Sequence, residues 1–217
     1  MGENFLLVEI LTATITLFLY LKLPIKLLRV DNLKSLIFNF VFVVICIGVF
    51  IYLAVKINSY SIQKIGIGLS NIKSAIIYVL PLTLVSILSL WAIAKFRKNR
   101  PKVSRNLIRL LLIYPLWAYI QQLLVLGLFG NWVVDYFGVM TAVLLVGTTF
   151  GLMHWGDHLL FSLSFFIGIC WALVFFSYPN LVPIAISHGF LATFYYYWIK
   201  KTDKWEEIFG SRGAYMR

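Results

Sequence analysis

The sequence predicts an all-α protein, a polytopic bundle of about seven transmembrane helices. Of its 217 residues, 61% are hydrophobic and only 12% are charged, whereas a soluble domain is about half apolar and about a quarter charged. The apolar residues come in blocks of roughly 20, the length at which a helix crosses a bilayer core. Backbone groups at that depth must find their hydrogen bonds within their own segment, so the blocks are expected to be helices.

Seven blocks can be placed along the chain. We expect spans at about 5–24, 35–57, 73–95, 106–129, 137–156, 158–177 and 181–199. Residues 59–71 are too few and too polar to cross, and we expect them to lie at the interface as a loop or an amphipathic half-turn. The spans divide into an N-terminal two-span region (1–58), a core domain (59–204) and a tail (205–217).

The net charge of +11 indicates orientation in a membrane and not binding to nucleic acid. Sixteen of the 19 Lys and Arg residues fall in the first loop, the third loop and the tail, and only Lys56, Lys64 and Lys73 fall on the other side. Cytoplasmic loops carry such an excess, which predicts an integral membrane protein with its N-terminus outside and its C-terminus in the cytoplasm. Cys46 and Cys170 lie inside apolar blocks and are expected to be small core residues.

Polar side chains inside spans are costly and are therefore candidates for function. In the last four spans they are Gln121, Gln122, His154, Asp157, His158 and His188. The two glutamines are adjacent, so they point about 100° apart on a helix. His154, Asp157 and His158 have the spacing i, i+3 and i+4, which predicts that they share one helical face. Three helices would then offer polar groups to one interior point.

Three interpretations of these groups stay open. The amides and imidazoles could be hydrogen-bonding glue between helices. They could form a metal site, with Asp157 or His188 as a third ligand, but Asp157 and His158 lie where the chain leaves the membrane, and we expect no metal and no cofactor. They could form a hydrolytic site. A transporter is disfavoured, because no inverted repeat is visible.

Two motifs favour the hydrolytic site. "FGLMH" (150–154) and "PIAISHGFLA" (183–192) resemble the second and third motifs of the CPBP intramembrane proteases, which include the CAAX prenyl endopeptidases and bacteriocin-processing and immunity proteins. The resemblance covers about residues 60–200. That family has the pattern EExxxR, then FxxxH, then HxxxN on successive helices. Carried onto this sequence, the glutamates fall on Gln121 and Gln122, the arginine on Leu126, the second motif on Phe150 and His154, and the third on His188 and Ala192.

The resemblance implies a CPBP-like core over 59–204 in a bacterial or archaeal cell membrane. It implies an endopeptidase acting on a membrane-proximal or lipid-modified peptide, with membrane lipid as its other partner. His154, His188 and Gln121 would hold the catalytic positions, supported by Gln122, Phe150, Asp157 and Ala192.

The glutamines change what such a site can do. An amide orients water but cannot take its proton, and general-base help is worth about 10²–10⁴ in rate. Two functions therefore follow as alternatives. One is an endopeptidase in which His154 acts as the base and Asp157 orients it. The other is an impaired pseudoprotease that binds a membrane peptide in an immunity or scaffold role.

Overall fold

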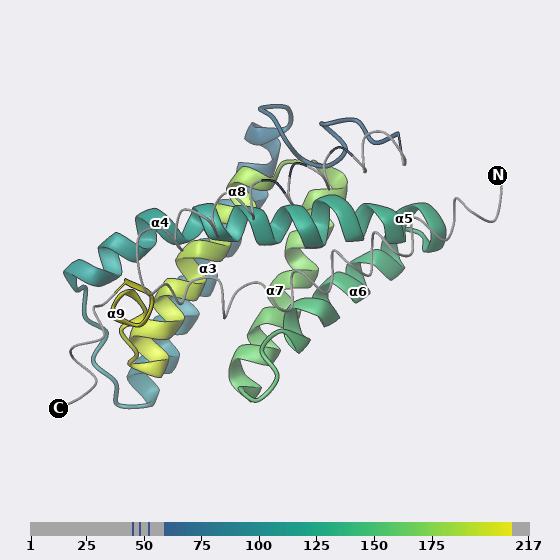
Figure 1. The fold of residues 1–217 in the computed structure, drawn as a ribbon. Helices are drawn as coiled ribbons and strands as arrows, with labels where there is room; N and C mark the ends of the chain where they lie inside the picture. The colour runs from purple at the N-terminus through teal and green to yellow at the C-terminus, as the bar shows by residue number, and fades with distance from the viewer. Residues whose placement is uncertain (1–44, 46–47, 49–51, 53–58, 210–217) are drawn as a thin grey trace. The chain divides into compact units, whose positions relative to one another are not determined.

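The computed structural model describes residues 45, 48, 52 and 59–209. All regular secondary structure in this part of the chain is helical (Figure 1). The described residues form two compact units, each built from two stretches of sequence. The first unit contains residues 59–75 and 120–181, and the second contains 76–119 and 182–209. The predicted span at 5–24 lies outside the described residues, as does that at 35–57 apart from the helical residues 45, 48 and 52.

The helices follow the apolar blocks. Their bounds are α3 (Ile72–Phe96), α4 (Arg105–Gln122), the π-helix η1 (Leu123–Gly130), α5 (Asn131–Phe137), α6 (Val139–Leu152), α7 (His158–Ser177), α8 (Leu181–Phe194), the π-helix η2 (Tyr195–Lys200) and α9 (Lys204–Phe209). Among the described residues, three helical segments are long and apolar enough to cross a membrane: Ile72–Phe96, Arg105–Phe137 and His158–Ser177. Three segments of this length and composition fit a helical membrane protein.

The predicted spans agree with the helices to different degrees. Those at 73–95 and 158–177 match α3 and α7 closely. The span at 106–129 continues to Phe137, because η1 and α5 extend α4 without a break. In the span at 137–156, Phe137 ends α5, and the helix that follows, α6, has only 14 residues, fewer than the roughly 20 that a crossing needs. The span at 181–199 corresponds to α8 and η2.

In the first unit, α6 and α7 pack side by side through small residues (Figure 1). A Cβ on Gly168 would lie 2.8 Å from the Phe150 ring and 3.3 Å from the Cα of Gly147. A Cβ on Gly147 would lie 2.6 Å from the Ile169 side chain. Gly147 and Gly151 have the GxxxG spacing that lets membrane helices approach closely. The α6–α7 pair is therefore held by backbone proximity, with the Phe150 side chain buried beside it.

The segment 59–71 is a loop, one of the two forms expected for it, and it packs into the first unit. Ile65 is fully buried, and its carbonyl oxygen lies 2.7 Å from where a Cβ on Gly127 of η1 would be. The Leu181 amide donates to the Gly66 carbonyl at 3.0 Å. The Asn180 Nδ2 donates to the carbonyls of Gly68 and Ser70 at 3.0 and 2.8 Å. We call residues 59–71 the docked loop.

The second unit contains α3 from Ile76 onward, α4 up to Tyr119, α8 from Val182 onward, η2 and α9. The Thr83 hydroxyl of α3 lies 2.7 Å from the Ser187 hydroxyl of α8, and both residues are buried. The α4 and α8 backbones are close, since a Cβ on Gly189 would lie 2.7 Å from the Pro115 nitrogen. A hydrogen bond between hydroxyl groups thus fixes α8 against α3, and close backbone packing at Gly189 fixes it against α4.

Candidate functional site

The two glutamines lie at the last two positions of α4, where the chain passes into η1. Gln122 is 0% exposed and Gln121 8%. Within the described part of the chain, the Oε1 atom of Gln121 is buried and accepts no hydrogen bond. Such an acceptor costs about 1–3 kcal/mol, and π-helical turns inside α-helices are frequent at functional sites. The Oε1 atom of Gln121 is therefore a buried, unsatisfied hydrogen-bond acceptor, and it lies just before a π-helical segment.

Leu126 is the residue onto which the resemblance carried the arginine of the first motif. It lies one turn after Gln122 within η1 and is fully buried. A buried arginine needs a carboxylate or an equivalent partner, and an amide does not neutralise its charge. The apolar side chain at this position is therefore compatible with amides at positions 121 and 122.

Phe150 and His154 lie at the C-terminal end of α6 in the first unit. Phe150 is buried against Trp171 of α7, with ring centroids 5.8 Å apart. His154 follows the end of α6, and its amide donates to the Gly151 carbonyl at 2.9 Å. Burial lowers the pKa of His154 below its usual value, although the nearby Asp157 carboxylate acts in the opposite direction. The imidazole is therefore neutral at pH 7 and able to accept a proton.

The prediction that His154, Asp157 and His158 share a helical face is wrong. α6 ends at Leu152 and α7 begins at His158, with a turn between them. The turn contains Gly156 at φ +99°, a conformation that favours glycine and stops the helix. Asp157 is the N-cap of α7, and its Oδ1 accepts from the Leu160 amide at 3.2 Å. The carboxylate expected to orient His154 is thus engaged in capping.

His188 and Ala192 lie on α8, in the second unit. His188 is buried, and its ring meets the Tyr114 ring of α4 edge-on, with centroids 6.4 Å apart. Its neighbour Ser187 takes part in the buried contact with Thr83. Ala192 offers no hydrogen-bonding side chain where the family pattern has asparagine.

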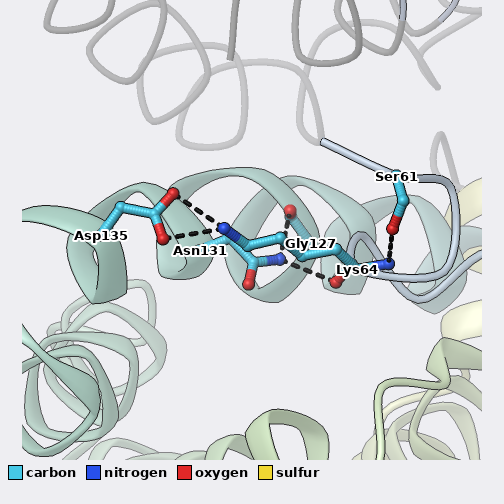
Figure 2. Close-up of polar contacts among 5 residues, drawn as sticks. All are labelled: Ser61, Lys64, Gly127, Asn131 and Asp135. Carbon is cyan, nitrogen blue, oxygen red and sulfur yellow. Dashed lines mark hydrogen bonds and ion pairs between the residues drawn. The ribbon is translucent and has the colours of Figure 1, made fainter. Parts of the chain in front are cut away.

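A second polar cluster joins the docked loop to α5, and it was not singled out from the sequence. Asn131 Nδ2 donates to the carbonyls of Lys64 and Gly127, both at 2.9 Å (Figure 2). The Lys64 ammonium bonds both carboxylate oxygens of Asp135 at 2.8 Å and lies 4.3 Å from the centre of the Tyr60 ring. Asn131 and Asp135 stand at i and i+4 after an apolar run, the signal that could have found them.

The titratable side chains of the described residues form no group of three or more that could hold a metal ion. The first unit thus holds buried amides, a neutral imidazole and a capping carboxylate, and the second unit holds a buried imidazole. Amides and a neutral imidazole can orient a polar ligand or a water molecule through hydrogen bonds. No known protein family, curated protein or solved structure matches the chain.

Proposed function

We propose that this membrane protein is a homologue of the CPBP intramembrane endopeptidases that binds a membrane-proximal or lipid-modified peptide and cleaves it weakly or not at all. We further propose that it lies in a bacterial or archaeal cell membrane with its N-terminus outside and its C-terminus in the cytoplasm. The positions that support peptide binding are Gln121, Gln122, Phe150, His154 and His188.

The buried Oε1 of Gln121 is the observation that carries the proposal. A hydrogen-bonding glutamine that only joined helices would be expected to use its acceptor within the folded chain, since a buried acceptor without a donor is costly. Among the described residues this one does not. An extended peptide has backbone N–H groups that lose water on entering the membrane and need acceptors. A bound peptide would therefore give the Gln121 amide oxygen a hydrogen bond that it does not have in the protein alone.

The same residues explain why hydrolysis should be slow. Attack by water on a peptide bond needs a group that accepts the water proton, and the amides of Gln121 and Gln122 have no useful basicity. Losing a general base costs about 10²–10⁴ in rate. An alanine at position 192 also removes an oxyanion donor relative to the family pattern, a loss of about 10²–10³ in other proteases. Together these losses favour binding over turnover.

An active endopeptidase is the second candidate, because the imidazole of His154 is a base of a kind that the glutamine amides are not. A neutral imidazole could take the proton that the glutamines cannot. Asp157 would have to support it while capping α7, which weakens this mechanism relative to peptide binding alone.

The test uses the full-length protein in liposomes with a farnesylated, membrane-anchored fluorescent peptide. Products are identified by mass spectrometry, and retained peptide is measured by fluorescence, for the wild type and the His154→Ala variant. The proposal expects bound, intact peptide and the same product level for both proteins. Specific products from the wild type that His154→Ala abolishes would establish the active endopeptidase instead, and absence of peptide binding would overturn both candidates.

A further inference from the structure

The second unit carries an unusually dense group of positive charges at one end of α3 and α4. Six cations fall within residues 95–105: Lys95, Arg97, Lys98, Arg100, Lys102 and Arg105. All six side chains are exposed. The sequence has no acidic residue between Asn71 and Val134 to balance them. We call residues 95–105 the basic loop.

The basic loop is held against the end of η2 by hydrogen bonds within the second unit. The side chain of Asn99 is buried, and its Nδ2 donates to the carbonyls of Trp198 and Ile199 at 2.8 and 3.3 Å. The Trp198 Nε1 donates to the Lys102 carbonyl at 3.4 Å. These bonds bring the exposed Lys200 and Lys201 to the same end of the unit. Two basic segments about 100 residues apart in sequence therefore form one surface.

The nearby carboxylates are directed to other partners. Asp203 accepts from Tyr197 at 2.6 Å and from Asn106 at 3.0 Å. Glu206 also accepts from Asn106, and Glu207 pairs with Lys204. Within the described part of the chain, none of the six cations of the basic loop forms an ion pair; Lys95 lies over the Trp91 ring. The basic loop therefore keeps its positive charge.

The position of the basic loop indicates which kind of partner it binds. It joins α3 to α4, two segments long and apolar enough to cross a membrane, so it must emerge at a bilayer surface. The exposed side chains of Phe96 (89%) and Val103 (69%) lie among the cations. Cations mixed with apolar side chains at this depth are suited to phosphate groups at the edge of the acyl region. A soluble nucleic acid would leave these apolar groups in water.

We propose that the basic loop, together with Lys200 and Lys201, binds the phosphate groups of anionic phospholipids in the leaflet it faces. This proposal rests on membrane insertion alone and is independent of peptide binding. Each cation close to an anionic surface contributes about fivefold in affinity at moderate salt. Removing three should therefore weaken binding at least about tenfold, even after screening.

The experiment measures binding of dansyl-labelled phosphatidylglycerol and phosphatidylcholine to the full-length protein in neutral detergent. The test variant is Arg97→Gln/Lys98→Gln/Arg100→Gln. Its matched control, Arg97→Lys/Lys98→Arg/Arg100→Lys, keeps every charge, and Lys73→Gln removes one exposed charge near the start of α3. Size-exclusion profiles and melting temperatures show whether each variant is folded.

We expect the wild type to bind phosphatidylglycerol more tightly than phosphatidylcholine. The glutamine variant should bind phosphatidylglycerol at least about tenfold more weakly than the wild type, and both controls should keep the wild-type preference. Raising the salt from about 0.1 M to 1 M, which shortens the screening length from about 10 Å to 3 Å, should abolish the preference without any mutation. Equal wild-type affinity for the two lipids would overturn the proposal. So would tighter binding of an oligonucleotide than of phosphatidylglycerol at equal phosphate concentration.

Discussion

Replacing Asn131 with alanine tests how the docked loop is held on the first unit. The Asn131 side chain is buried, and its amide donates to one carbonyl of the loop, on Lys64, and one of η1, on Gly127 (Figure 2). The Asn131→Ala change removes both bonds and leaves the Lys64 carbonyl without this donor. The apolar side chains of the docked loop, including Ile65, are not altered.

The size of the effect follows from the number and kind of bonds. Only the bond to the Lys64 carbonyl joins the loop to α5, because the bond to Gly127 lies within the helix, and a partly buried acceptor left without its donor costs about 1–3 kcal/mol. The ion pair between Lys64 and Asp135 joins side chains that are 37% and 38% exposed, and such pairs contribute about 0.2–1 kcal/mol. The buried amide should therefore hold the loop more strongly than the visible ion pair.

Hydrogen exchange measured by mass spectrometry on peptides covering residues 60–71 provides the assay. Ile65, Gly66 and Ile67 report loop opening, since their amides donate within the loop at 3.2, 3.0 and 3.0 Å. Asn131→Ala should raise their exchange rates about 5- to 150-fold. Gln63→Ala, an exposed change on the same loop, is the control. If Asn131→Ala exchanges no faster than this control, the amide does not hold the loop.

Three further predictions concern contacts elsewhere in the two units. Lys64→Gln should raise exchange in the docked loop less than about fivefold, and a larger rise than that of Asn131→Ala would reverse the ranking of amide and ion pair. Gly189→Ala should lower the melting temperature by the equivalent of about 1–3 kcal/mol, because its Cβ would lie 2.7 Å from the Pro115 nitrogen; an unchanged melting curve would contradict this packing. Burial acts to raise the pKa of Asp203, but hydrogen bonds from Tyr197, Asn106 and backbone amides outweigh it and hold the pKa below its usual value. The carboxylate therefore stabilises the fold above its ordinary pKa of about 3.9. That contribution is lost as the pH falls through the folded-state pKa, so exchange in residues 203–209 should rise below about pH 4, and Asp203→Asn should remove this dependence.

The helices were predictable where length and boundary signals agree. α7 matches the predicted 158–177 because an aspartate that caps its first turn precedes it and the Tyr178–Pro179 pair follows it. The extension of α4 was not predictable, since Gly127, Gly130 and Asn131 are typical of a helix end. In the structure these residues continue the helix, with Gly127 giving room to the docked loop and Asn131 bonding to it. A tertiary contact thus outweighs the local signal.

The candidate site was predictable in its residue types and less so in its geometry. Burial of Gln121, Gln122 and His188 follows from polar groups in apolar helices. The positive φ of Gly156, which separates His154 from His158, could not be deduced from a spacing that also fits a helix. Lys64 and Asp135 are 71 residues apart in sequence, so no local sequence pattern predicts that they form an ion pair.

The most direct test of the peptide-binding account is the effect of Gln121→Met on stability and on peptide binding together. Methionine keeps the length of the side chain and removes the buried acceptor, so the melting temperature should stay the same or rise. Affinity for the farnesylated peptide, measured in the same preparation, should fall about tenfold, because a peptide N–H loses its partner. A lower melting temperature with unchanged peptide affinity would show that Gln121 joins helices and would contradict the account.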